Sequence, residues 1–196
     1  GHQFGNFTIL GDGRAVIIGE HITNNKRRVD IQLKGSGQTP YSRNGDGKGT
    51  LKSMIREYII SEAMNNLNIK TTRSLAVLKT GEKIHRTGFE EGGILIRVSK
   101  SHIRVGTFQF AKISKEKEHI QNLLEYSIER LYPTLLEKKN RFIKFFEKIT
   151  KNQIELILDW QRVGFIHGVM NTDNMSLSGE TIDYGPCAFL DEYNPN

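Results

Sequence analysis

Apolar residues follow strand-like spacings in the first half of this chain and helical spacings in the second, and this order is the strongest constraint on its fold. Short β-leaning runs occur at 4–10, 15–22, 29–34, 75–78 and 94–98. Helical spacings dominate from residue 115 onward. Strands followed by helices, without internal repeats, predict an α+β protein with a sheet-rich unit and a helical unit. We place these units at 1–105 and 106–196, with the boundary between 99 and 112.

The first unit is expected to hold a sheet and one long helix. The strand at 29–34 alternates strictly between apolar and polar residues, which predicts a half-buried strand with its apolar side in the core. A turn is expected at 79–82, and the long loop at 35–47 has a length typical of functional loops. Thr50 is the expected N-cap of a helix over about 50–67. Its predicted core stripe comprises Leu51, Met54, Ile55, Tyr58, Ile59 and Ala63.

Two further helices are expected in the second unit. The first is marked by Ile120, Leu123, Leu124, Ile128 and Leu131. The second covers 140–163 and carries Phe142, Phe146, Ile149, Ile154, Leu158 and Trp160.

Composition narrows the classes of function. The 196 residues are 37% hydrophobic and 26% charged, as in a globular protein, and no apolar run is long enough to span a membrane. The single cysteine, Cys187, excludes an internal disulfide and favours a reducing compartment, which is the cytoplasm or, in a eukaryote, the mitochondrion. A net charge of +6 suits an acidic partner such as a nucleotide triphosphate. Nucleic acid is the weaker alternative, because Lys and Arg are scattered among Asp and Glu. We expect a monomer, cut from the middle of a longer polypeptide.

The segment 165–185 carries the most specific chemistry. It contains two oxygen ligands, Asn174 and Asp183, which a short hairpin between them would fold toward each other. Carboxylate and amide oxygens suit a hard cation such as Mg²⁺. Protein kinases hold their metals with a catalytic-loop Asn and a later Asp-Phe-Gly aspartate, and Asp183-Tyr-Gly stands in the second place here. The alternative is a polar turn that is merely rich in Asn and Asp.

A strand lysine and a helix glutamate precede this segment in the order that kinases use. Lys34 ends a predicted strand, and Glu57 lies in the middle of the following helix. Kinases pair such residues to place the ammonium on nucleotide phosphates. The alternative is that both side chains are simply exposed to solvent. The sequence order Lys, Glu, Asn, Asp favours the functional interpretation, since four residue types must coincide.

Two glycine turns and two arginines could add contacts to phosphate. A phosphate-binding turn could be formed by Gly11, Gly13 and Arg14, and a second one by Asp46 and Gly47. The alternative is an ordinary turn, because Asp-Gly is a common turn sequence. Arg97 lies in a predicted strand and Arg104 at the predicted boundary between the units. Guanidinium groups match phosphate oxygens in a bidentate way, whereas two surface arginines on a sheet are the alternative.

Four further residues of the second unit bear on the structure of the loop or on the identity of the catalytic base. His167 stands in an apolar context, which predicts a hydrogen-bonded residue that anchors the loop. Cys187 is expected to be a small buried residue, with a redox role as the lesser option. In a kinase loop the base lies five residues before the metal Asn. That position is Val169 here, which cannot accept a proton, and the nearest carboxylate is Asp173.

Together these motifs resemble the selenoprotein O family, also called YdiU or UPF0061, over the whole chain. The most specific match is the loop 167–175 with 178–186. Further matching segments are Gly1–Gly5, Leu10–Ala15, Gln32–Gly35, Thr39–Arg43, Ile55–Glu57, Ser61–Met64 and Arg104–Phe108.

The resemblance implies a protein-kinase-like two-lobed fold, with a β-rich N-lobe and a helical C-lobe that is truncated here. It implies AMPylation, the transfer of AMP from ATP to protein Ser, Thr or Tyr hydroxyls, with Mg²⁺ or alternatively Mn²⁺. It also implies that ATP binds in reversed orientation, with its phosphate tail toward Lys34, Arg97 and Arg104. Asp173 would then be the base, and Asn174 and Asp183 the metal ligands. An ordinary protein kinase, a nucleotide-binding pseudokinase module and an inactive fragment remain as alternatives.

Overall fold

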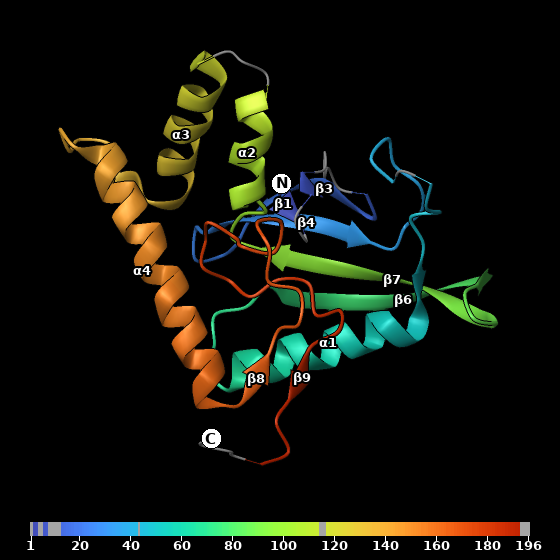
Figure 1. Ribbon diagram of the computed structural model, residues 1–196. Coiled ribbons are helices and arrows are strands. Elements are labelled where there is room, and N and C mark those ends of the chain that lie inside the picture. Colours follow the sequence, from blue (N-terminus) through green and yellow to red (C-terminus); the bar gives the residue numbers. More distant parts are fainter. Residues whose placement is uncertain (1, 4–5, 8–12, 43, 114–116, 193–196) are drawn as a thin grey trace. The chain divides into compact units, whose positions relative to one another are not determined.

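The computed structural model describes residues 2–3, 6–7, 13–42, 44–113 and 117–192. The chain divides into two compact units, one formed by residues 9–100 and the other by 1–8 with 101–196. Figure 1 shows the elements of both, and each unit is described by itself. The secondary structure is mixed, with antiparallel sheets and four α-helices among the described residues, so the expected α+β class is confirmed. No described helix is long and apolar enough to cross a membrane.

The unit 9–100 is built on a five-stranded antiparallel sheet. Its strands are β3 (Ala15–Ile22), β4 (Arg28–Lys34), β5 (Gly49–Thr50), β6 (Arg73–His85) and β7 (Phe89–Ser99). β4 lies between β3 and β7, and β7 also pairs with β5 and β6. Gln32 of β4 is paired with Arg97 of β7, which places the two side chains next to each other.

The buried face of β4 is its polar face, contrary to the prediction. Asp30, Gln32 and Lys34 are buried, whereas the apolar residues that alternate with them are only half-buried. Hydrophobic alternation identified the strand correctly. It gave the wrong inner face, because polar side chains that find hydrogen-bond or ionic partners can be buried as fully as apolar ones.

Helix α1 (Leu51–Asn66) packs on β6 and β7 (Figure 1). The residues that it buries form a partly polar stripe. Its predicted N-cap is confirmed, since the Thr50 hydroxyl accepts a hydrogen bond from the Ser53 amide at 3.3 Å. The predicted core stripe is wrong for most of its members: Ile55, Tyr58, Ile59 and Ala63 are exposed. The buried residues are Met54, Glu57, Ser61 and Met64. These four residues lie on one face of the helix, which is shifted by about one residue position from the predicted hydrophobic stripe.

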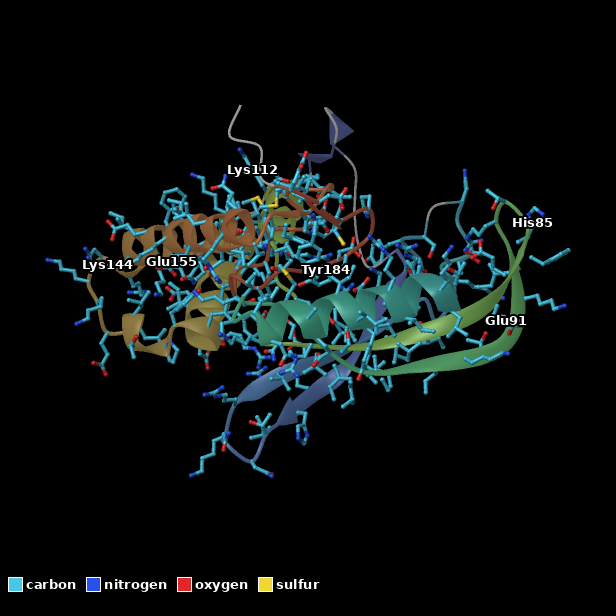
Figure 2. The ribbon with its side chains drawn as sticks, turned by 90° about the horizontal axis from the view of Figure 1, so that it is seen from below. His85, Glu91, Lys112, Lys144, Glu155 and Tyr184 are labelled. Atoms are coloured by element: carbon cyan, nitrogen blue, oxygen red, sulfur yellow. The ribbon has the colours of Figure 1, made fainter. Side chains whose placement is uncertain are left out.

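The hairpin of β6 and β7 is longer than predicted. The expected turn at 79–82 is wrong, because β6 continues through it with an irregular register between Lys79 and Lys83. Gly81 adopts φ +80° there, as a bulge residue does. The chain reverses only after His85, and His85 and Glu91 lie near that far end (Figure 2).

Helices dominate the unit 1–8 with 101–196. They are α2 (Val105–Ile113), α3 (Lys117–Leu131), the 3₁₀ turn η1 (Pro133–Leu135) and α4 (Arg141–Arg162). Two short pairs complete it: β1 (His2–Gln3) with β2 (Asn6–Phe7), and β8 (Phe165–Ile166) with β9 (Ala188–Phe189). The rest of the strand expected at 4–10 lies outside the described residues. Ile128, Phe145 and Leu177 form a buried core cluster.

Helix α4 exists as predicted, and Trp160 of the predicted stripe is buried and Ile149 half-buried, but the other members are exposed. Phe146 is 71% exposed, and Phe142, Ile154 and Leu158 are also exposed. The buried residues are Phe145, Asn152, Gln153, Leu156 and Trp160. Lys144 and Glu155 lie on the same helix (Figure 2). Asn152 and Gln153 are buried because they hydrogen-bond inside the unit, which a count of apolar residues cannot anticipate.

Candidate active site

A buried ionic cluster stands at the centre of the sheet unit. The Nζ atom of Lys34 lies 2.5 Å from Oε2 of Glu57, so the predicted strand-to-helix pair is formed. The other oxygen of Glu57 accepts from Nη2 of Arg97 at 2.5 Å. Nη1 of Arg97 donates to Oε1 of Gln32 at 3.0 Å. All four side chains are buried, and sequence reasoning missed Gln32 because a strand glutamine carries no functional signal by itself.

Two cations share one carboxylate in this cluster, which has consequences for ligand binding. Burying charge is costly unless it is paired and hydrogen-bonded, and Glu57 supplies both cations with a partner. With two positive charges against one negative charge, the three groups carry a positive excess. Such an excess favours an anionic ligand over a neutral or cationic one.

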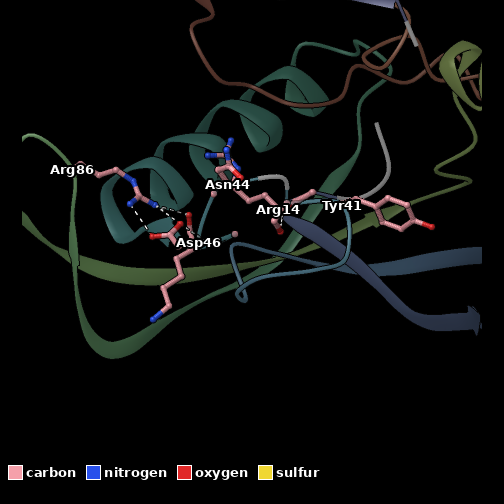
Figure 3. Close-up of a pocket in the computed structure, with 10 residues that line it drawn as sticks. Arg14, Tyr41, Asn44, Asp46 and Arg86 are labelled. Atoms are coloured by element: carbon pink, nitrogen blue, oxygen red, sulfur yellow. Dashed lines mark hydrogen bonds and ion pairs between the residues drawn. The ribbon is translucent and has the colours of Figure 1, made fainter. Parts of the chain in front are cut away.

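A cavity of about 600 Å³ lies in the same unit. It is lined by the residues directly before β3, by the loop that follows β4 and by Arg86 in the turn of the β6–β7 hairpin. Gly13, Arg14, Asp46 and Gly47 line it, so the structure brings these four predicted residues together (Figure 3). The remaining lining residues are Tyr41, Ser42, Asn44, Gly45, Lys48 and Arg86. Gly11 lies outside the described residues. The Ser42 hydroxyl donates to the carbonyl of Gly13 and so joins the two loop segments.

Arg86 holds the Asp46 loop in place from the end of the β6–β7 hairpin. Its two terminal nitrogens each lie 2.9 Å from an oxygen of Asp46, and Nη2 also donates to the carbonyl of Lys48 at 3.1 Å (Figure 3). The hydrogen bonds from Arg86, followed by that from the Lys48 amide, hold the pKa of Asp46 below its usual value of 3.8. Arg86 was missed in the sequence because the turn was expected before it.

Gly47 is required by the backbone of this loop. It adopts φ +65°, a left-handed conformation that favours glycine. A Cβ atom at this position would also overlap the backbone carbonyl of Gly37. The glycine therefore lets the two ends of the loop touch.

The helical unit holds the catalytic-loop candidates in a tight turn. The Asp173 amide donates to Oδ1 of Asn171 at 2.8 Å, and the Asn174 amide donates to the carbonyl of Asn171 at 3.0 Å. The Asp173 side chain is buried. Nδ2 of Asn174 donates to the carbonyl of Val169 at 2.7 Å, which leaves Oδ1 as the oxygen of this amide that can face a ligand.

The segment between Asn174 and Asp183 is a turn, so the predicted hairpin of paired strands is wrong. The Gly179 amide closes the turn on the carbonyl of Ser176 at 3.0 Å, and Ser176 forms an isolated bridge with Arg104. Asp183 adopts φ +70°, which is unusual for a residue with a side chain. Such a conformation persists where the surroundings enforce it, and it is common at functional sites.

Helix α4 and the loop residue His167 hold this turn through buried polar contacts. Nε1 of Trp160 donates to the Thr181 hydroxyl at 2.9 Å, and Nε2 of Gln153 donates to the carbonyl of Ser176 at 2.7 Å. Nε2 of His167 lies 2.8 Å from the carbonyl of Ile182, and the imidazole stacks on Trp160. The predicted anchoring role of His167 is therefore confirmed, and Cys187 is buried, as predicted.

The residues of the turn fit a hard cation. Among the described residues, no three His, Cys, Asp or Glu side chains lie together as a metal site. A cation here would depend on Oδ1 of Asn174, on Asp183 and on oxygens of its own ligand. Mg²⁺ is commonly bound in this way, through one or two protein carboxylates and substrate phosphates.

Comparison with known proteins settles the family. The sequence model of the family described as protein adenylyltransferase SelO matches residues 1–196. The chain belongs to the SelO family.

Several curated relatives in the SelO family carry the name protein nucleotidyltransferase YdiU. The relative from Lachnoclostridium phytofermentans is 62% identical over 195 residues, and that from Clostridium perfringens is 59% identical over 196 residues. The relative from Pelagibacter ubique is 58% identical over 195 residues. Each match covers 100% of this chain and 40% of the relative, so the chain spans less than half the length of these proteins.

The predicted SelO-family site residues thus fall into two sets, one in each unit. In the unit 9–100, Lys34, Glu57 and Arg97 meet in the buried cluster, and the Gly13 and Asp46 segments line one cavity. The other set lies at 104–183. There Arg104 is half-buried, and its amide donates to the Thr107 hydroxyl at 3.1 Å at the start of α2.

Proposed function

We propose that this protein transfers AMP from ATP to Ser, Thr or Tyr hydroxyls of other proteins. The observation that carries the proposal is the turn at 171–174. It holds the buried carboxylate of Asp173 next to the side-chain amide of Asn174, whose oxygen could bind a metal ion. Membership of the SelO family and the name nucleotidyltransferase of its relatives support the same reaction class.

The sheet unit would bind the nucleotide. Its buried cluster has the positive excess that a polyphosphate needs, and guanidinium groups match phosphate oxygens closely. Arg97 and Lys34 are assigned to the β- and γ-phosphates. The cavity lined by Arg14, Asp46 and Gly47 is assigned to the remainder of the nucleotide.

The helical unit would carry out the transfer. Asp173 accepts the proton of the attacking hydroxyl, whose oxygen forms a bond to the α-phosphorus while the bond from that phosphorus to pyrophosphate breaks. Asn174 and Asp183 would hold Mg²⁺, or Mn²⁺ in its place, which supplies charge neutralisation at the phosphates when bound. Pyrophosphate leaves, and AMP stays on the protein substrate.

We infer that the chain has a protein-kinase-like fold, in which 9–100 corresponds to the N-lobe. The strand lysine paired to a helix glutamate supports this inference, as does the order of Asn174 and Asp183. Val169 occupies the place of the usual kinase base. The proton acceptor must therefore differ from that of a kinase, which favours transfer at the α-phosphorus over ordinary phosphorylation.

Labelled ATP tests the reaction directly. The protein, expressed at the full length of its relatives, is incubated with Mg²⁺ and with ATP labelled at either the α- or the γ-phosphorus. We expect protein-bound label from the α-position only. Label from the γ-position only would establish an ordinary kinase instead, and no transfer together with retained ATP binding would establish a nucleotide-binding module.

Asp173 is tested in the same assay. The Asp173→Ala variant should lose AMP transfer while it keeps ATP binding, because the carboxylate acts on the hydroxyl and not on the nucleotide. General bases typically contribute about 10²–10⁴-fold in rate. Transfer at the parent rate would remove Asp173 as the base.

A further inference from the structure

The carboxylate of Asp173 lies directly against Gly106, in the first turn of α2. A Cβ atom built on Gly106 would overlap Oδ1 of Asp173 and would stand 3.1 Å from its Cγ and 3.2 Å from the carbonyl of Thr172. Both residues are buried. The space that a side chain would occupy at residue 106 is thus taken by the proposed base.

The backbone at Gly106 gives no other reason for a glycine. Its φ is not in the left-handed region, so an L-residue could adopt this conformation without strain. Glycine is also one of the weakest helix formers, whereas alanine is the strongest. The glycine therefore opposes helix formation here, and the one feature that requires it is the close approach of Asp173.

Two backbone hydrogen bonds fix the distance between α2 and the turn that bears Asp173. The Gly106 amide donates to the carbonyl of Thr172 at 2.8 Å, and the Val105 amide donates to the carbonyl of Met175 at 3.0 Å. These contacts join the helix to the chain on both sides of Asp173. An added methyl group would consequently be relieved by rotation of the carboxylate, the most mobile of the groups that it meets.

We propose that Gly106 is a positioning residue that sets where the Asp173 carboxylate can lie, and so where a substrate hydroxyl can be deprotonated. This inference rests on the proposed function of Asp173 as the base. A displacement of about 1 Å at a reacting group can lower the rate about 10²-fold. The atoms nearest to an added Cβ at Gly106 belong to Asp173 and Thr172, so its effect should fall on the transfer step.

The Gly106→Ala variant is compared with Gly19→Ala, a control glycine on β3 that has no atom within 4 Å of an added Cβ. The assay is AMP transfer by the protein at the full length of its relatives. We expect kcat to fall roughly 10- to 100-fold in Gly106→Ala, with the KM for ATP unchanged. The control should keep both constants. A parent-like kcat in Gly106→Ala would overturn the proposal.

A double variant separates positioning from general damage. When Asp173→Ala has removed the carboxylate, Gly106→Ala should lower the residual rate no further, because its effect passes through that group. An equal loss in both backgrounds would overturn the proposal. The double variant should also have a higher melting temperature than Gly106→Ala alone, since the overlapping atoms are gone. If Gly106→Ala fails to fold, Gly106→Ala with Asp173→Ala must fold, or the proposal is wrong.

The same assays distinguish a failure of the proposed function from a failure of the positioning role of Gly106. If Asp173→Ala transfers AMP at the parent rate, the assignment of the base is wrong, and the positioning role falls with it. If Asp173→Ala is inactive while Gly106→Ala is fully active, the base stands and only the role of Gly106 is refuted.

Discussion

At the scale of single residues, Glu57 joins two buried cations, and its removal should affect both. Its two oxygens face Lys34 and Arg97 at 2.5 Å each. In Glu57→Gln the two cations would remain buried with their shared negative charge gone. Removal of one partner from a buried ion pair typically costs about 3–5 kcal/mol of stability. Urea unfolding measures this loss.

The chain contains a matched control for Glu57. Glu20 pairs with Arg28 through two hydrogen bonds, at 2.7 and 2.8 Å, but this pair is exposed. Glu20→Gln should therefore cost about 1 kcal/mol or less. Equal losses in the two variants would contradict the burial of the cluster in solution.

Arg97 should also distinguish ATP from AMP. Arg97→Lys keeps the charge but loses the planar fork that donates to both Gln32 and Glu57. We expect ATP binding to weaken by about 1.5–3 kcal/mol, the usual worth of a hydrogen bond to a charged group. Binding of AMP, which has no β- or γ-phosphate, should change little. Calorimetric titration with both nucleotides tests this, and a parallel loss for AMP and ATP would make Arg97 purely structural.

At the scale of elements, the contact between the β6–β7 hairpin and the Asp46 loop depends on charge. Arg86 keeps the pKa of Asp46 below 3.8, so the carboxylate's contribution to stability is present above that pH and is lost as the pH falls through the folded-state pKa. Arg86→Ala should raise the pKa of Asp46 toward its usual value, while the hydrogen bond from the Lys48 amide still lowers it. At neutral pH it should cost about 0.2–1 kcal/mol, because the pair is exposed. An NMR titration of Asp46 measures the shift, with Arg28→Ala as the control that should leave it unchanged.

The elements also show how far sequence reasoning reaches. Strand alternation located β4, and an N-cap located the start of α1, because both signals are local. The inner faces of β4 and α1 were predicted wrongly, since Gln32 and Glu57 are buried by partners far away in the chain. The same holds for Asn152 and Gln153 of α4. Hydrophobicity does not record whether a polar side chain will find a partner. The motif around Asn174 and Asp183 could be recognised because its residue types and spacing are themselves specific.

At the scale of the whole molecule, ligand binding provides a test that does not depend on transfer. The chain spans 40% of the length of its curated relatives, so its behaviour as a separate polypeptide is informative in itself. Any ligand that binds the native state and not the unfolded chain must stabilise the native state. If the sheet unit binds the phosphate tail, Mg²⁺-ATP at 100 times its Kd should stabilise the fold by about 2.7 kcal/mol.

A variant of the buried cluster, tested with ATP and with AMP, shows whether the thermal shift arises from that cluster. Lys34→Met removes a cation of that cluster while it retains the length of the side chain. The melting temperature of this variant should therefore respond less to Mg²⁺-ATP than that of the parent, and its own melting temperature without nucleotide serves as the reference. AMP should raise the melting temperature of both proteins by a similar, smaller amount, because it lacks the phosphates assigned to Lys34. If Lys34→Met responds to ATP as fully as the parent, the phosphates bind elsewhere and the positive excess of the cluster has a structural origin.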